Sequence, residues 1–160
     1  MSKKIQLILI IVTVIMSFTG IAIWWSVRSG VDLKENTTIV IDGETNKTLK
    51  ADIGNLYPGK SSEYVISLSG DTAKEYAITL KFYNDNGGAL KNYVSVEIRT
   101  ENVTINKTLS ELLDGETVSL GDCVNDITIC YTMSADAGNE SQGSDIVFFI
   151  DLNAKNTKKQ

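Results

Sequence analysis

From residue 31 onward, apolar and polar side chains alternate along the chain with a period of two, which is the pattern of β-strands with one buried and one exposed face. The clearest runs are residues 76–82, 94–98 and 127–133. Shorter runs cover residues 38–41, 49–53, 63–68, 103–106 and 117–120. Residues 146–150 are apolar on both faces, which indicates a central strand or a strand whose second face meets a partner. Glycine-containing turns separate these runs, so the pattern predicts an all-β sandwich.

One short segment departs from this alternation and predicts a helix. Thr108 and Glu111 stand three residues apart, just before Leu112 and Leu113. This is the arrangement of a capping box, in which the threonine and glutamate side chains bond each other's backbone amides. We therefore expect one short turn of helix over residues 108–113.

Residues 1–30 follow a different pattern. Residues 5–27 carry no charged side chain, with two lysines before them and Arg28 after them, and a helix of this length can cross a membrane. The basic side chains at the start favour a cytoplasmic N-terminus and an extracytoplasmic domain. Trp24, Trp25 and Arg28 suit the membrane interface and favour a retained anchor, whereas small residues at 19–22 leave a cleaved signal segment open.

The chain therefore divides into three parts: an N-terminal signal or membrane-anchor segment (residues 1–30), one extracytoplasmic β-domain (residues 31–154) and a basic C-terminal tail (residues 155–160). All 20 acidic residues lie beyond residue 31, and the net charge of the whole chain is −5. Phosphate binding requires clustered lysines and arginines, which the domain lacks, so we expect no nucleic-acid partner.

The composition also bears on catalysis, because the chain contains no histidine. Ser-His-Asp sites, Cys-His sites, zinc hydrolases of the His-Glu-x-x-His kind and histidine-ligated metal sites are thereby excluded. Carboxylate or Ser-Lys chemistry is left open by the composition, but no pattern of residues points to it. We expect a protein that is not an enzyme and that holds no catalytic residues, no metal and no cofactor.

The two cysteines, Cys123 and Cys130, are seven residues apart. On one straight strand this odd separation would place them on opposite faces, so a disulfide between them requires a bend. Asn125 and Asp126 are turn-forming residues, and an extracytoplasmic location favours a persistent disulfide. The sequence thus predicts an intrachain bridge, with free buried thiols or thiols linked to a partner as the alternatives.

Several asparagines lie in N-glycosylation sequons, in which Ser or Thr stands two residues later. They are Asn36, Asn46, Asn102, Asn106 and Asn139. In a host that glycosylates exported proteins, these side chains would carry glycans that shield strand edges. In other hosts they would form part of a bare surface rich in asparagine and threonine, and the sequence leaves both interpretations open.

Two short motifs resemble those of a known family. Residues 53–60, Ile-Gly-Asn-Leu-Tyr-Pro-Gly-Lys, resemble a turn that precedes a strand in the TasA/camelysin family. Residues 131–133, followed by residues 137–143 and an apolar strand, resemble that family's closing hairpin. The resemblance extends over most of residues 20–154, although Lys60 stands where the family usually has an acidic residue. The family includes bacterial biofilm-matrix fibre subunits and related archaeal bundling pili.

The resemblance implies a jelly-roll-like β-sandwich that is exported through its N-terminal segment. It also implies polymerisation by donor-strand complementation, in which a strand of one subunit completes a sheet of the next. Residues 31–41 would be the donor strand, and its apolar inserts would be Val31, Leu33, Ile39 and Ile41. The expected fold class is thus an all-β jelly-roll or immunoglobulin-like β-sandwich, preceded by one N-terminal hydrophobic helix.

Two functions follow as alternatives. The first is a subunit of an extracellular fibre, pilus or biofilm matrix, whose main partner is another copy of itself. The second is a membrane-tethered binding module, held by residues 5–27, which recognises another surface protein through the face that carries Phe149 and does not polymerise. Both place the domain outside the cytoplasm, at the cell surface or secreted.

Overall fold

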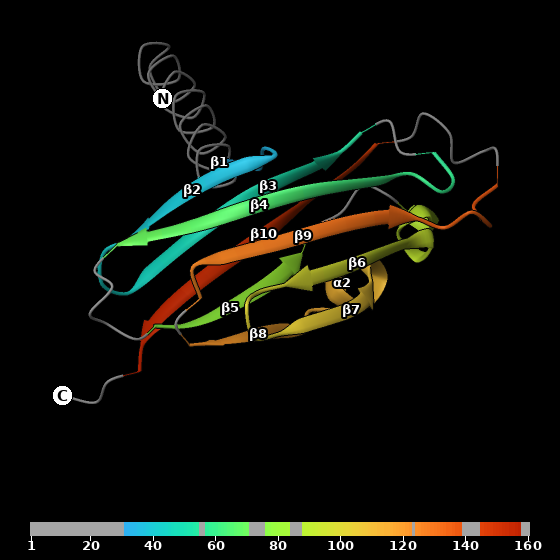
Figure 1. Ribbon diagram of the computed structural model, residues 1–160. Coiled ribbons are helices and arrows are strands. Elements are labelled where there is room, and N and C mark those ends of the chain that lie inside the picture. The colour runs from blue at the N-terminus through green and yellow to red at the C-terminus, as the bar shows by residue number, and fades with distance from the viewer. Residues whose placement is uncertain are drawn as a thin grey trace, which may run out of the picture. The chain divides into compact units, whose positions relative to one another are not determined.

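The computed structural model describes residues 31–54, 57–70, 76–83, 88–122, 124–138 and 145–157. They belong to one compact unit that begins at Val31, and most of them lie in the strands of two sheets (Figure 1). The predicted all-β class is confirmed. The predicted N-terminal helix lies outside the described residues, as do Trp24, Trp25 and Arg28. In the described part of the chain, no helix has the length and apolar character that a membrane crossing requires.

The first sheet, sheet A, has five strands in the order β1-β3-β10-β5-β8. Their bounds are Val31–Asp32 (β1), Thr45–Ile53 (β3), Ile146–Asn156 (β10), Tyr76–Tyr83 (β5) and Thr117–Asp122 (β8). β10 lies between β3 and β5, which confirms the central-strand explanation for the run that is apolar on both faces. It also continues to Asn156, so the domain takes in the first two residues of the predicted basic tail.

The second sheet, sheet B, has the order β2-β4-β9-β6-β7. Its strands are Asn36–Ile41 (β2), Ser61–Gly70 (β4), Asp126–Met133 (β9), Val94–Arg99 (β6) and Thr104–Thr108 (β7). A 3-10 helix, η1 (Gly88–Tyr93), precedes β6, and the short helix α2 (Leu109–Leu113) connects β7 of sheet B to β8 of sheet A. A strand is therefore present at each predicted run. Most strand ends extend beyond the predicted ones, although β7 begins one residue later, at Thr104.

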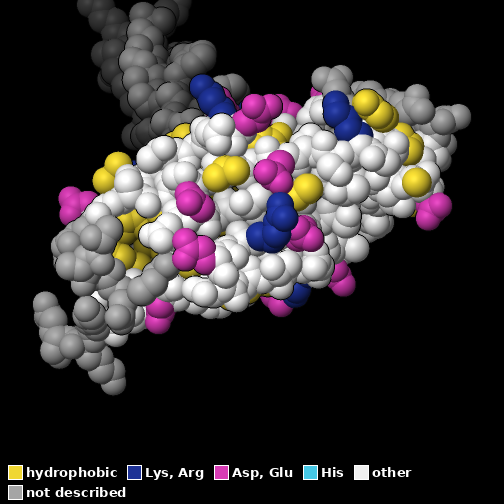
Figure 2. Space-filling model, viewed as in Figure 1, with side chains coloured by type: hydrophobic (Ala, Val, Ile, Leu, Met, Phe, Trp, Pro, Cys, Tyr) yellow, Lys and Arg dark blue, Asp and Glu magenta, His cyan; other side chains and the backbone are white. Residues whose placement is uncertain are grey.

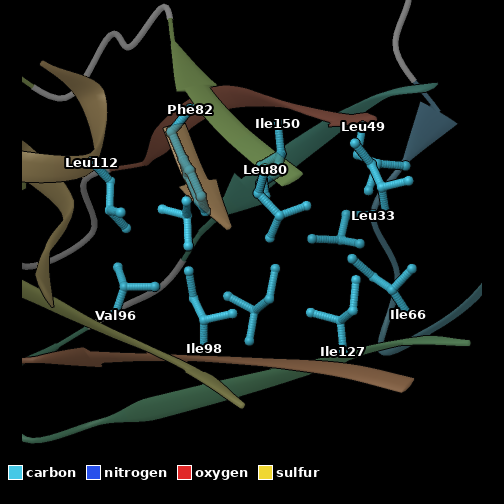
Figure 3. Packing of buried hydrophobic residues seen from close by; sticks show 14 of the residues in the cluster. Leu33, Leu49, Ile66, Leu80, Phe82, Val96, Ile98, Leu112, Ile127 and Ile150 are labelled. Carbon is cyan, nitrogen blue, oxygen red and sulfur yellow. The ribbon is translucent and has the colours of Figure 1, made fainter. Parts of the chain in front are cut away.

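The inward faces of the two sheets form one hydrophobic core (Figure 3). Phe148 of β10 lies at its centre, with ring centroids 6.0 Å from Phe82 and 5.7 Å from Tyr131. Burying one such side chain stabilises a fold by about 1.5–3 kcal/mol. A slip of one residue in a strand with one polar face would turn its apolar face to solvent, so the alternation seen in the sequence fixes the register of those strands.

Helix α2 begins with the predicted capping box. The Thr108 hydroxyl accepts a hydrogen bond from the Glu111 amide at 3.3 Å, and the Glu111 carboxylate accepts one from the Thr108 amide at 2.7 Å. The helix turns Leu109 and Leu112 fully into the core. This short helix is therefore specified twice, by its cap and by its buried leucines.

Candidate functional site

The candidate site is the N-terminal segment of the domain, residues 31–41, which closes one side of the sandwich (Figure 1). β1 lies at the edge of sheet A beside β3, and β2 lies at the edge of sheet B beside β4. Residues 33–35 cross between the two sheets. Both strands run parallel to their neighbours, whereas the other strand pairs of the described residues are antiparallel.

Backbone hydrogen bonds attach this segment to both sheets. The Leu33 amide donates to the Lys50 carbonyl of β3 at 2.7 Å, and the Val65 amide of β4 donates to the Glu35 carbonyl at 2.8 Å. β2 then follows β4 over its whole length without a shift of register. The attachment is that of an added edge strand, which depends mainly on main-chain groups and on the side chains that point inward.

Three of the four predicted apolar inserts are buried in the core. Leu33 is 7% exposed, and Ile39 and Ile41 are each 5% exposed. In Figure 3, Leu33 lies between Leu49 of β3 and Ile66 of β4. Val31, the fourth predicted insert, is 54% exposed in this single copy because it stands at the outermost edge of sheet A.

A fourth inward-facing side chain of the segment, Thr37, was missed in the sequence. It is only 9% exposed, and its polarity is satisfied locally: its hydroxyl accepts a hydrogen bond from the Lys34 amide at 3.1 Å. Its position in the strand could have identified it, because Thr37 lies two residues before Ile39 and four before Ile41 and so faces the same side of the strand. This hydrogen bond stabilises the turn by which the segment passes from sheet A to sheet B.

The far end of the segment depends on a glycine. A Cβ atom on Gly70, the last residue of β4, would lie 2.1 Å from the carbonyl oxygen of Ile41. No real side chain tolerates such an approach, so β2 reaches its observed position only because Gly70 has no side chain.

The two motifs that carry the family resemblance meet in space. The Lys60 amide donates to the Tyr57 carbonyl at 2.9 Å, which closes the turn through Gly59, and the Met133 amide donates to the Lys60 carbonyl at 3.0 Å. Lys60, which departs from the family pattern, has its ammonium 5.1 Å from the centroid of the Tyr57 ring, a cation–π contact. The turn before β4 and the end of β9 thus form one structural unit.

The outer face of sheet B is mainly uncharged and polar, with scattered charges (Figure 2). Arg99 forms ion pairs at 3.0 Å with both Glu63 and Glu97. Next to them lies a shallow groove of about 450 Å³ that includes Cys130 and Lys107. Lys107 is ion-paired with Glu116, so the acidic and basic groups that border the groove largely neutralise each other.

Three titratable groups of the described residues have clearly shifted pKa values. Burial raises the pKa of Tyr131 well above its ordinary value and, together with the charge of Asp52, raises the pKa of Tyr64. Hydrogen bonds from Thr108 lower the pKa of Glu111. All three shifts move away from neutral pH, whereas proton transfer near neutrality requires the opposite. Within the described ranges, no three Cys, Asp or Glu side chains gather into a possible metal site.

The predicted disulfide is not present at Cys130, which is a free, half-buried cysteine. It stands in the middle of β9, in register with Glu63 of β4 and Glu97 of β6. An extended strand rises about 3.3 Å per residue, so Cys130 lies about 13 Å along β9 from its first residue. The predicted bend falls between the end of β8 at Asp122 and the start of β9 at Asp126, and Cys123 lies outside the described residues.

The sequon asparagines that the structure describes are all exposed. Asn36 lies on β2, Asn46 on β3, Asn106 on β7, and Asn102 in the bend before β7. Asn139 lies outside the described residues. Each of the four described side chains is therefore accessible for modification.

The outer face of sheet A carries Phe149, which the binding-module hypothesis places at the interaction surface. Phe149 is half-buried, and its ring stacks on Tyr83 at 5.8 Å between centroids. Beside it, Asp151 accepts hydrogen bonds from the Thr48 hydroxyl at 2.6 Å and from the Tyr83 hydroxyl at 3.0 Å. The side chains of this patch are thus held in place by one another.

Comparisons with known proteins assign no family. No family model matches the chain, and no curated protein matches it. Among solved structures, it is similar to PliG of Salmonella Typhimurium, a periplasmic lysozyme inhibitor of g-type lysozyme, with 8% identity, a TM-score of 0.44, and coverage of 74% of this chain and 98% of that one. A mutant of the corresponding Escherichia coli protein gives 9% identity, a TM-score of 0.41, and coverages of 75% and 97%. Likeness at this level carries no functional assignment.

Proposed function

We propose that this chain is an extracytoplasmic structural protein, the subunit of a fibre, pilus or biofilm matrix that assembles by strand donation. Residues 31–41 of one copy would complete the sandwich of the next. The observation that carries the proposal is the placement of this segment, which is the first part of the domain and adds a parallel strand to the edge of each sheet.

The strand order supports treating this segment as an addition to a finished body. Without it, sheet A has the order β3-β10-β5-β8 and sheet B the order β4-β9-β6-β7. Eight strands divided in this way between two sheets agree with a jelly roll. The segment would then be a ninth and tenth strand that any copy of the chain can supply.

The energetics explain why the body needs such a segment. Leu33, Ile39 and Ile41 contribute about 1.5–3 kcal/mol each by burial, and a whole domain is typically stable by only about 5–15 kcal/mol. A body without the segment would expose an apolar groove and two unpaired strand edges, which makes it marginally stable and adhesive. Either its own segment or that of a neighbour must therefore fill the groove.

The extracytoplasmic location in this proposal rests on the sequence of residues 1–30. A basic start and an uncharged run of membrane-spanning length direct the following domain out of the cytoplasm. A donor strand directly after such a run is well placed for assembly, because cleavage or release of residues 1–30 would free the strand to reach a neighbour.

A mixing experiment tests strand donation directly. Asn36 of β2 and Val65 of β4 are register partners, so Asn36→Cys in one population and Val65→Cys in another can form a disulfide only if the strand passes between copies. Both variants also carry Cys123→Ser and Cys130→Ser. We expect cross-linked dimers after the two populations are mixed during assembly and oxidised.

The matched control uses the same acceptor cysteine. Val65 is also the register partner of Thr128 on β9, which belongs to the body in either case. Val65→Cys mixed with Thr128→Cys should give no cross-link between copies. Equal cross-linking in the two mixtures, or none in either, would refute donation.

The second candidate function is the membrane-tethered binding module, which does not polymerise. The aromatic pair of Tyr83 and Phe149 on the outer face of sheet A favours it, because fixed aromatic rings beside a hydrogen-bonded carboxylate suit the recognition of another surface protein. This alternative predicts that the segment stays in its own chain and that neither mixture cross-links.

A further inference from the structure

The sandwich has four strand edges, and one of them is unlike the others. β1 contains only two residues, and β8 is interrupted by a shift of register against β5. β7 carries Lys107, which is ion-paired with Glu116. Short length, bulges and lysines are the devices by which natural proteins prevent edge strands from pairing with other chains.

β2 has none of these devices. Its six residues, Asn-Thr-Thr-Ile-Val-Ile, contain no charge and no proline, and its register against β4 is regular throughout. No described strand pairs with its other side. The Val40 side chain of β2 is 64% exposed, the largest exposure among the large apolar side chains of the described residues. A regular, uncharged, strongly β-forming strand of six residues on an open edge is a template for pairing.

The backbone parity of β2 identifies the groups that are available. The Glu35 carbonyl accepts a hydrogen bond from Val65 of β4, and in a regular strand the backbone groups of alternate residues point the same way. The odd-numbered residues therefore bond to β4. The amides and carbonyls of Asn36, Thr38 and Val40 point away from the sheet.

The charges that flank β2 select the partner. Lys34 precedes the strand and Asp42 follows it, and both are exposed. If two copies of β2 pair antiparallel about a two-fold axis at Thr38, Lys34 of each copy lies beside Asp42 of the other. In the same register, Asn36 lies opposite Val40 and Thr38 lies opposite itself, so no like charges meet.

We propose that the free edge of β2 is a symmetric docking surface for a second copy of this chain, which joins two sheets B into one continuous ten-stranded sheet. This inference goes beyond the proposed strand donation. The edge is open whether β2 belongs to its own domain or has been donated by a neighbour, because donation uses only the side that faces β4. Pairing through β2 would therefore connect fibres, or single domains, sideways.

The test uses the full chain, with Cys123→Ser and Cys130→Ser, produced in a host without Asn-linked glycosylation because Asn36 stands in a sequon. Thr38→Cys places one cysteine on the two-fold axis, within the Cα distance that a disulfide spans. Thr104→Cys is the matched control, since Thr104 is also an exposed threonine on an edge strand of sheet B. We expect oxidation to convert Thr38→Cys mainly to a dimer and to leave Thr104→Cys monomeric.

A second pair of variants tests the same edge without a disulfide. Thr38→Lys brings two ammonium groups together on the axis and should weaken dimerisation at least tenfold in sedimentation experiments, whereas Thr104→Lys should leave it unchanged. Equal cross-linking at positions 38 and 104, or a Thr38→Lys variant that associates like the parent chain, would overturn the proposal.

The outcome is separable from that of strand donation. A Thr38→Cys dimer without any cross-link between Asn36→Cys and Val65→Cys would refute donation alone. A cross-link between those two variants without a Thr38→Cys dimer would refute edge pairing alone.

Discussion

Two segments connect an edge strand of one sheet to an edge strand of the other, one on each side of the sandwich (Figure 1). On one side, residues 33–35 pass from β1 to β2. On the other side, α2 passes from β7 to β8. Both place leucines in the core, since Leu33 is 7% exposed and Leu109 and Leu112 are 0% exposed. The two crossings thus solve the same packing problem, which is to fill the open side between two sheets.

They differ in how the chain holds them. α2 is fixed by an antiparallel strand at each end and by its own capping box. Residues 31–41 pair in parallel and are joined to the eight-stranded body only through the turn at Gly43. A segment tied at both ends cannot leave without unfolding its neighbours, whereas one tied at a single end can swing out and be replaced. This difference is why we place assembly on the N-terminal side.

The largest expected loss of stability comes from a charge buried either in residues 31–41 or in α2. Ile39→Asp and Leu112→Asp each place a carboxylate in the core, and each should lower the free energy of unfolding by at least about 3 kcal/mol. Urea denaturation measures both losses. Adding an excess of a peptide with the native sequence of residues 31–41 should restore the Ile39→Asp domain only, because the peptide can occupy the groove that the defective segment leaves.

The peptide result can break the comparison. If it also restores Leu112→Asp, it stabilises the domain by a general effect and says nothing about the groove. If the peptide restores the stability of neither variant, residues 31–41 cannot be exchanged any more than α2 can, and strand donation is not possible.

A smaller effect is expected from one glycine on each side. Gly70→Ala puts a Cβ atom against the Ile41 carbonyl, so the end of β2 must move, at a cost of about 2–3 kcal/mol. Gly115, which follows α2, has a φ of +93° with open space around it, so Gly115→Ala costs only the backbone strain, about 1 kcal/mol. Hydrogen exchange should accelerate at the amides of β2 in Gly70→Ala and remain unchanged there in Gly115→Ala. Slow exchange in both would mean that β2 tolerates the displacement.

The sequence predicted the side of the sandwich that carries α2 better than the side that carries residues 31–41, for a physical reason. The capping box of Thr108 and Glu111 and the alternation in β9 are local patterns, which depend on residues close together in the chain. The position of β2 depends on Gly70, which is far along the chain and whose small size becomes meaningful only once Ile41 lies against it. Thr37 was missed for a similar reason, because a threonine reads as polar until its hydroxyl is seen bonded within the turn.

The cysteines also show that a pattern in the sequence does not by itself decide the structure. The spacing of Cys123 and Cys130 left a bridge open if a bend intervened, and the sequence contains turn-forming residues between them. The chain does leave β8 at Asp122 and enter β9 at Asp126, but Cys130 is free and lies well inside β9, because Ile127, Ile129 and Tyr131 are all needed in the core. The demand for burial thus decided the path of the chain, whereas cysteine spacing did not.

The smallest expected effect concerns the cap that fixes the far side. Hydrogen bonds from the backbone and side chain of Thr108 lower the pKa of Glu111 below its ordinary value of 4.5. Since the pKa is lower in the folded state, the cap stabilises the domain above that value and loses its contribution as the pH falls through the folded-state pKa. Glu111→Gln keeps an acceptor at the cap but removes the titration.

Glu111→Gln should therefore show a shallower loss of stability than the parent chain between about pH 5 and about pH 3, measured by urea denaturation at each pH. Glu44→Gln removes an exposed carboxylate near β2 and serves as the control for the loss of one negative charge. If Glu111→Gln shows the same loss of stability with falling pH as the parent chain, the charge of Glu111 adds nothing to the cap. The attachment of α2 then depends only on its buried leucines and on the antiparallel strands at its two ends.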